Sequence, residues 1–196
     1  MPLLKLEPDA FPEDAFLLPV ASAPWWVAHA RSRQEKALAR YLRPLRVPFY
    51  LPQREHAVRR QGRTRRSYLP LFPGYLFFRG GPEERLAALR SNLIVKVLEV
   101  GNQALLSEEL GQLRRLQVSG AALAPFEPLP EGAPVRIVEG AFEGYVGVIV
   151  RGGERPRLVV SISILRKAVA VELDRGAVTR LPPSSTAGID VRRAVA

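Results

Sequence analysis

The sequence predicts an α+β protein with an N-terminal α/β sandwich, a proline-rich linker and a small five-stranded β-barrel. Helix-like and strand-like periodicities alternate as far as residue 118. Residues 119–132 contain Pro125, Pro128 and Pro130 and have no periodicity, which is typical of a linker between domains. The next 50 residues hold short alternating segments separated by glycines, and a closed barrel would protect the edges of such strands.

The N-terminal domain is expected over residues 25–118, after a flexible leader at 1–24 that is rich in Pro, Ala and acidic residues. Ser32-Arg33-Gln34-Glu35 fits a capping box, and Pro44 would end the helix that follows it. The dipeptide Gln61-Gly62 fits the turn of a β-hairpin. The expected elements are a strand at 25–30, a helix before Pro44, a strand at 47–52, hairpin arms at 54–60 and 64–70, a strand at 71–78, a helix at 82–90, a strand at 93–100 and a third helix capped by Ser107.

The barrel domain is expected over residues 133–182, and residues 183–196 are expected to form a flexible tail. Its segments are rich in Val and Ile, which favours strands over helices. The predicted strands are 134–139, 145–151, 157–163, 166–172 and 177–180.

Composition excludes several classes of protein. The chain has no Cys and no run of 18 uncharged apolar residues, and its first residues do not form a signal peptide. His29 and His56 lack a nearby Ser/Asp constellation, and no phosphate loop or metal-ligand spacing is present. We therefore expect a cytoplasmic, non-enzymatic protein without metal or cofactor.

Positive charge is concentrated in one segment. The net charge is +10, and residues 31–90 hold 15 Arg or Lys against four Glu. Such clustering is expected of a surface that faces phosphates or another acidic partner. A general preference for Arg is the alternative, but it would spread the arginines more evenly along the chain.

Two passages in this order carry a resemblance to a known family. The first is Leu71-Phe72-Pro73-Gly74-Tyr75-Leu76-Phe77, which follows a basic hairpin and an opening aromatic strand. The second is the stretch from Gly132 to Ile149, which looks like the KOW motif that opens a small barrel. Together they resemble the NusG family of transcription elongation factors over about residues 25–181. The resemblance implies a ferredoxin-like NGN domain followed by an SH3-like KOW domain.

The resemblance implies that the first domain binds the clamp helices of the large RNA polymerase subunit through an apolar concavity. Aromatic anchors in a groove give a large contact area at small entropic cost. The alternative is that these side chains belong to the core, since the alternation of a strand does not say which face is exposed. By motif position the polymerase-binding residues are His29, Leu71, Phe72, Pro73, Tyr75 and Phe77.

Nucleic-acid contacts, to non-template or upstream DNA, are expected from the basic segment. Its hairpin tip is too rich in arginine to be buried easily and suits phosphate contact, although a solvated charged loop is the alternative. The end of the second helix corresponds to the place where family members touch the non-template strand, or it is an ordinary polar helix end. The candidates are Arg31, Arg33, Lys36, Arg59, Arg60, Arg63, Arg65, Arg66, Arg90, Ser91 and Asn92.

The KOW domain is expected to recruit a second partner, such as Rho or a small-subunit ribosomal protein. Phe142, Tyr145, Ile164 and Leu165 would form the partner-binding patch, or they would fill the small core. Leu165 stands near a position where NusG itself usually has Phe, and that Phe contacts both partners. This departure resembles specialised paralogs such as RfaH and the UpxY-type regulators, and favours an operon-specific antiterminator that acts as a monomer.

A second class of function also fits the sequence. A KOW barrel also occurs in RNA-binding and ribosome-associated proteins, which would place the basic RNA-binding half at residues 131–196. Those residues carry a net charge of only +3, against +11 for residues 31–90. The charge distribution therefore favours the polymerase-binding interpretation.

Overall fold

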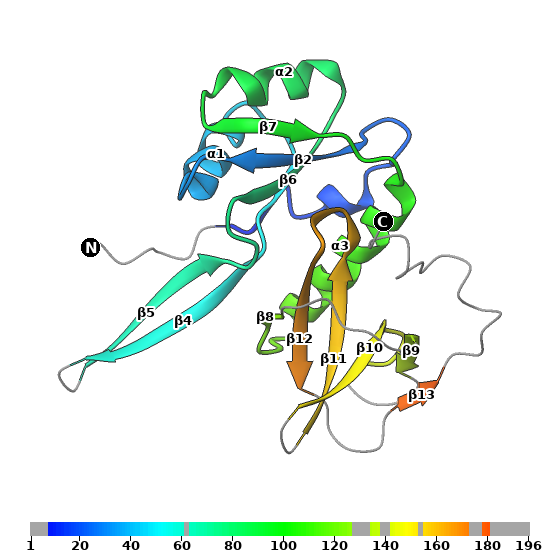
Figure 1. Cartoon of the computed structure of the whole chain (residues 1–196). Coiled ribbons are helices and arrows are strands. Elements are labelled where there is room, and N and C mark those ends of the chain that lie inside the picture. The colour runs from blue at the N-terminus through cyan, green and yellow to red at the C-terminus, as the bar shows by residue number, and fades with distance from the viewer. Residues whose placement is uncertain are drawn as a thin grey trace. The chain divides into compact units, whose positions relative to one another are not determined.

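The computed structural model describes residues 8–60, 63–126, 134–137, 142–152, 155–172 and 178–180 (Figure 1). The chain divides into two compact units between Ser107 and Glu108. Each unit has its own main antiparallel sheet, and the first also carries a separate two-stranded ribbon. The mixed helix and strand content agrees with the predicted α+β class, but the division falls inside the third helix instead of the proline-rich stretch.

A five-stranded antiparallel sheet organises the first unit, in the order β1-β3-β6-β2-β7. Its central pair is β2 and β6, in which Trp26 is opposite Phe78 and Ala28 is opposite Leu76. β7 is an edge strand, and its ladder with β2 is irregular at His29. The strands are β1 (Ala10–Phe11), β2 (Trp25–Ala30), β3 (Phe49–Tyr50), β6 (Tyr75–Arg79) and β7 (Ile94–Leu98).

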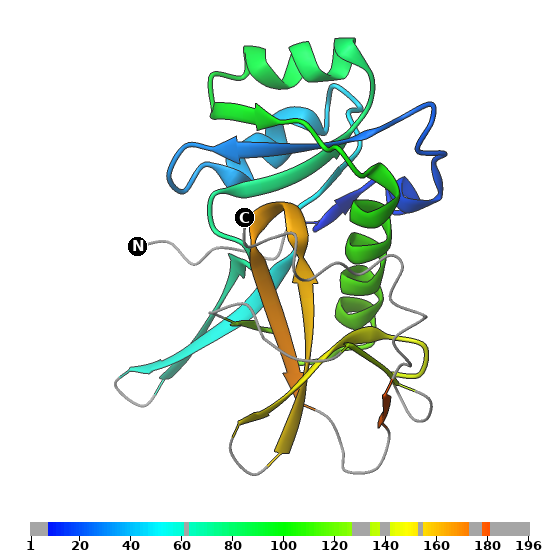
Figure 2. The same cartoon turned by 45° about the vertical axis from the view of Figure 1, so that its right-hand side comes forward.

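Helices α1 (Glu35–Leu42) and α2 (Pro82–Arg90) contribute to an apolar core on one face of this sheet. Alternate strand residues such as Ala28 and Phe78 pack there with Leu38 of α1 and Ala88 of α2. α2 lies beside β7 (Figure 2). Because successive side chains of a strand point to opposite faces, the neighbours of these residues in β2 and β6 lie on the other face.

Residues 10–23 are ordered, although the sequence predicted a flexible leader there: β1 pairs with β3 in the sheet, and the short helix η1 (Ala15–Leu17) packs on that other face. This helix places the ring of Phe16 5.5 Å from Trp25 and 5.0 Å from Tyr50, between centroids. The buried guanidinium of Arg79 donates to the carbonyls of Ala15 (2.7 Å) and Ala23 (2.8 Å). Aromatic burial and these hydrogen bonds order the segment, so the predicted leader does not extend over residues 10–23. Residues 1–7 lie outside the described part.

The predicted hairpin is present as the two-stranded ribbon β4 (Gln53–Arg60) and β5 (Arg63–Pro70). It pairs along its whole length, from Gln53 opposite Pro70 to Arg60 opposite Arg63. In both views the ribbon extends away from the five-stranded sheet (Figures 1 and 2). Its side chains are exposed from Glu55 to Arg59, so both of its faces are open to solvent there.

The second unit contains a six-stranded antiparallel sheet in the order β13-β9-β10-β11-β12-β8. Its strands are β8 (Ala124–Phe126), β9 (Pro134–Ile137), β10 (Val146–Gly152), β11 (Arg155–Ile162), β12 (Lys167–Glu172) and β13 (Val178–Arg180). The last five agree with the predicted strands to within a few residues. β8 was missed because it lies in the proline-rich stretch, where it pairs with β12. The predicted tail at 183–196 lies outside the described residues.

The third helix, α3 (Gln103–Val118), begins four residues before the predicted cap at Ser107. The carboxamide oxygen of Asn102 accepts from the backbone N–H of Leu105 at 3.0 Å and so caps the helix instead. Gln103 bonds both the N–H and the carbonyl of Trp25. The residues of α3 from Glu108 onward belong to the second unit.

Candidate functional site

A Pro-Gly turn positions a pair of stacked rings at the start of β6. Gly74 adopts φ +86°, a conformation that glycine adopts without strain, and its N–H donates to the Glu35 carboxylate at 2.6 Å. Its carbonyl accepts from the N–H of Ala30 at 2.8 Å. The turn is thus held by α1 on one side and by β2 on the other. Glu35 was predicted to close a capping box, but α1 has no side-chain cap.

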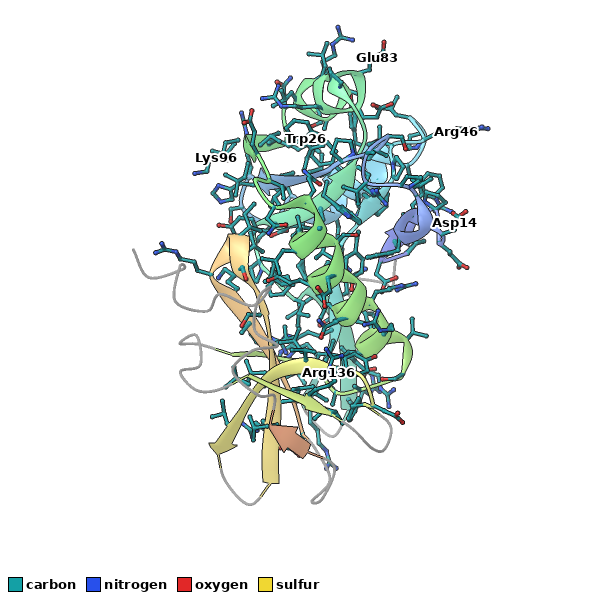
Figure 3. All side chains as sticks on the ribbon, turned by 90° about the vertical axis from the view of Figure 1, so that its right-hand side faces the viewer. Asp14, Trp26, Arg46, Glu83, Lys96 and Arg136 are labelled. Carbon is teal, nitrogen blue, oxygen red and sulfur yellow. The ribbon has the colours of Figure 1, made fainter. Side chains whose placement is uncertain are left out.

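His29 and Tyr75 form the stacked pair, with ring centroids 5.1 Å apart and planes inclined by 19°. Both side chains are half-buried, and Pro73 beside them is exposed. The ring nitrogen Nδ1 of His29 is buried and has no hydrogen-bond partner in the described residues. Lys96, opposite His29 on β7, is exposed and points outward (Figure 3). We call His29, Pro73 and Tyr75 the aromatic cluster.

The other residues predicted for polymerase binding lie in the core. Phe77 is fully buried, and Leu71 and Phe72 are 1% and 2% exposed. The rings of Phe72 and Phe77 meet edge to face at 6.3 Å. Of the six predicted residues, only those of the aromatic cluster have side chains accessible to solvent.

Two predicted nucleic-acid-binding loops are brought together by a hydrogen bond between them. The N–H of Arg31 donates to the carbonyl of Leu93 at 2.8 Å, which joins the loop before α1 to the loop after α2. Arg33 and Asn92 both adopt positive φ in these loops. Ser91 is used locally, since its hydroxyl donates to the carbonyl of Ala88 and accepts from the N–H of Leu93.

Exposure separates the basic candidates. Arg31, Arg33, Arg90 and Asn92 are exposed around the joined loops. Lys36 is only 5% exposed, so the structure removes it from the surface on which the sequence placed it. The helical pattern placed Lys36 on the polar side of α1, but a pattern within one helix does not show which neighbouring segments cover a side chain.

The remaining predicted arginines lie on the β4–β5 ribbon. Arg59, Arg63 and Arg66 are exposed, and Arg66 makes an ion pair with Glu55 at 3.4 Å. In the ribbon, Arg60 is opposite Arg63 and Arg65 is opposite Val58. The ribbon therefore carries a high density of arginine outside the core of the first unit.

The residues predicted for the partner-binding patch of the second unit are mostly covered. Tyr145 is 7% exposed and Leu165 is 9% exposed, while Phe142 and Ile164 are half-buried. Phe142 meets Tyr145 edge to face at 6.0 Å, and the Arg115 guanidinium lies 5.4 Å from the Tyr145 ring centroid. Burial raises the pKa of Tyr145, and the charge of Arg115 opposes that rise. Of the predicted KOW passage, residues 132, 133 and 138–141 lie outside the described part.

Glu109 of α3 is a buried carboxylate that the sequence analysis did not single out. It accepts from the backbone N–H of Ser163 at 3.1 Å and also from the Ser163 hydroxyl. One turn later, Gln112 accepts from the N–H of Val146 at 3.1 Å. Burial raises the pKa of Glu109 to about 7, although the hydrogen bonds from Ser163 act in the opposite direction. The sequence did hold a sign that Glu109 is buried, because it lies among Leu106, Leu110 and Leu113 on the apolar side of the helix.

Nothing in the described ranges forms a metal centre, because no three His, Cys, Asp or Glu side chains gather there. No helix in the same ranges is both long and apolar enough to cross a membrane.

Comparison with known proteins gives one match to a family model and one to a curated protein. Residues 23–113 match the family model "NusG: Transcription termination factor nusG". The transcription termination/antitermination protein NusG of Vibrio parahaemolyticus serotype O3:K6 (strain RIMD 2210633) is 27% identical over 188 residues. That alignment covers 80% of this chain and 95% of the Vibrio protein.

Solved structures give a weaker likeness. One is described as "Domain interaction in Thermotoga maritima NusG", with a TM-score of 0.49, 19% identity, and coverage of 84% of this chain and 100% of that chain. Another is the MjSpt4:Spt5 complex in conformation B, with a TM-score of 0.29, 13% identity, and coverage of 80% and 96%. The family match covers just under half of the chain and includes the Pro-Gly turn and the aromatic cluster, and together with the Vibrio relative it supports a likeness to the NusG family.

Proposed function

We propose that this protein is a non-enzymatic transcription termination/antitermination factor that binds RNA polymerase. The observation that carries the proposal is the accessible His29–Tyr75 stack on the Pro-Gly turn, inside the stretch that matches the NusG family. The relative from Vibrio bears the same function in its name. The chemistry is that of binding, in which a factor favours one state of the polymerase over another.

The docking surface for the polymerase clamp helices is the aromatic cluster. Tyr75 and His29 offer flat, rigid rings, and Pro73 adds an exposed apolar edge. Leu71, Phe72 and Phe77 act from beneath, as the packed layer that fixes the position of the turn.

The basic loops and the ribbon contact DNA near the polymerase. Arg31, Arg33, Arg90 and Asn92 are exposed on two loops that a backbone hydrogen bond joins, which supports a shared contact with DNA. Arginine and asparagine there suit phosphates and base edges, respectively. This contact would add a salt-dependent term to the affinity for the transcribing complex.

The second unit is a KOW-type barrel that recruits a further partner, such as Rho or a ribosomal protein. Phe142 and Ile164 are its accessible apolar side chains, whereas Tyr145 and Leu165 are covered. Leu165 in place of an aromatic residue supports a specialised antiterminator. Such a factor should lower pausing and termination on a restricted set of templates in a transcription assay.

The experiment that tests the docking surface is a pull-down of core RNA polymerase with the full chain. Tyr75→Ala should lose most of the bound polymerase, and Tyr41→Ala should keep it, because Tyr41 packs against the helical core. Phe77→Ala is unsuitable, since truncating a fully buried Phe costs about 3–5 kcal/mol of stability. Equal binding by the wild type and Tyr75→Ala would contradict the docking surface. Binding of RNA but not polymerase by the wild type would favour an RNA-binding KOW protein.

A further inference from the structure

We propose that one face of the β4–β5 ribbon binds the phosphate backbone of double-stranded DNA, while the opposite face does not. We call the first the basic face: by register it comprises Arg54, His56, Val58, Arg60, Arg63, Arg65, Ser67 and Leu69. This inference deepens the DNA contact of the proposed function, and rests on it. It assigns that contact to one side of one element and names the form of nucleic acid.

The register makes the two faces electrostatically unequal. The basic face has four arginines and no acidic residue. The opposite face has Arg59, Arg66 and Glu55, and the carboxylate of Glu55 lies 3.4 Å from Nε of Arg66. One of the two arginines there is therefore already paired within the ribbon. By register, the basic face therefore has a larger excess of arginine over acidic residues than the opposite face, and we expect a phosphate backbone to bind there.

The ribbon has the size and isolation that groove binding requires. Each strand has eight residues, which extend over about 26 Å at roughly 3.3 Å per residue. The major groove of B-DNA admits a two-stranded β-ribbon. An isolated two-stranded ribbon is only marginally stable in water, and Val58 on the basic face is 46% exposed. Binding along a duplex would cover this face and support the pairing of the strands.

The distribution of aromatic residues favours duplex over single-stranded nucleic acid. Proteins that bind single strands stack the bases on aromatic side chains. The basic face has no Phe, Tyr or Trp, and the ribbon's Tyr68 is opposite Glu55, on the other face. What the basic face offers is guanidinium groups, one imidazole and the Ser67 hydroxyl, which contact phosphates rather than base planes.

The test compares two double variants of the full chain that remove equal charge from the two faces. Arg60→Gln with Arg63→Gln alters the basic face, and Arg59→Gln with Arg66→Gln alters the opposite face next to the same turn. Binding of a labelled 20-base-pair DNA duplex is measured by fluorescence anisotropy over a series of salt concentrations. Circular dichroism and thermal unfolding of both variants check that the fold is kept.

The basic-face variant should bind the duplex at least about tenfold more weakly, and its salt slope should fall by about 1.8, for two lost phosphate contacts. The opposite-face variant should change affinity by less than about threefold. Equal losses in both variants would overturn the assignment to a face, since they would reflect total charge alone. Tighter binding of the wild type to a single strand of the same sequence would overturn the choice of duplex.

A polymerase pull-down with the same variants separates this inference from the proposed function. The basic-face variant should still bring down polymerase, because the aromatic cluster is unchanged. If it loses polymerase while its DNA affinity is unchanged, the basic face binds an acidic protein surface and the inference is wrong. If the wild type binds no polymerase but the DNA results are as expected, the proposed function fails and the DNA-binding face stands.

Discussion

Three buried charged side chains, Glu35, Arg79 and Glu109, bind backbone groups of segments far from them in sequence. A buried charge is costly unless hydrogen bonds satisfy it. Each of these side chains holds a different segment of the chain in place. Glu35 fixes the Pro-Gly turn, Arg79 fixes the N-terminal segment, and Glu109 fixes the start of η2 (Ser163–Leu165).

Replacement of Glu35 should destabilise the first unit by way of the Pro-Gly turn. Glu35→Ala removes the acceptor of the Gly74 N–H, and an unsatisfied buried donor costs about 1–3 kcal/mol. Urea unfolding followed by tryptophan fluorescence measures this loss, since Trp25 and Trp26 lie in the same sheet. Glu83→Ala, at an exposed position of α2, is the control. Equal stability of the two variants would show that the turn does not depend on Glu35.

Glu109 should make the stability of the second unit depend on pH. Its pKa is about 7 in the folded chain against the model-compound value of 4.5, so the folded state binds more protons between these values. Stability from this group is therefore fully present below pH 4.5 and is lost as the pH rises through about 7. Between pH 5 and 8 the free energy of unfolding of the wild type should fall by roughly 2–3 kcal/mol more than that of Glu109→Gln.

Chemical denaturation at the two pH values, followed by hydrogen exchange in the six-stranded sheet, measures this difference. The control is Glu108→Gln, since Glu108 is exposed and is the only other carboxylate that raises the Glu109 pKa. An identical pH dependence in the wild type and Glu109→Gln would contradict the assignment.

At the scale of elements, the N-terminal segment depends on Arg79 of β6. Arg79→Met keeps an apolar stem but leaves the carbonyls of Ala15 and Ala23 without their donor. The amides of Ala15 and Ala23, which bond Pro12 and Pro19, should then exchange with solvent about tenfold faster or more. Hydrogen exchange measured by mass spectrometry over residues 9–24 tests this expectation. Arg85→Met is the matched control, because Arg85 packs on Trp26 at the other face of the sheet. Unchanged exchange in Arg79→Met would show that the aromatic contacts of Phe16 are enough to keep the N-terminal segment ordered.

The elements that could be predicted from sequence are those with a strong local signal. The apolar run of β6, the Pro-Gly turn and the hairpin around residues 61–62 all have one. The order of residues 10–23 has no local signal, because it comes from contacts of Phe16 and Arg79 with residues far along the chain. The proline-rich composition likewise gave no sign of β8, which forms through its hydrogen bonds with β12.

The candidate site could be located from the sequence, but its accessible side could not. Spacing placed His29, Tyr75 and Phe77 together, and strand alternation put them on one face. Exposure then depends on which segments cover that face. Other segments cover Phe77 and leave Tyr75 accessible, and the sequence of β6 alone does not show this difference. The same holds for Lys36, whose burial depends on the tertiary surroundings of α1.

At the scale of the whole molecule, the two units should lose their structure separately. In the full chain, Glu109→Ala with Gln112→Ala leaves the N–H groups of Ser163 and Val146 without acceptors. Exchange should accelerate at these two amides and along β10 and β11. The amides of β2 and β6 should keep their wild-type rates, since they lie in the other unit. Uniform acceleration in both sheets would instead indicate a single cooperative unit.

The division of the chain inside α3 has a consequence for recombination between relatives. A hybrid gene that joins two family members at the proline-rich stretch, residues 119–132, would pair a foreign sheet with the resident helix. Glu109 and Gln112 would then face backbone groups that they were not selected to bind. A crossover just before Gln103 would transmit helix and sheet together. The unit that would be inherited together is therefore the helix with its sheet, and a sheet inherited alone would arrive without the side chains that hold η2 and β10.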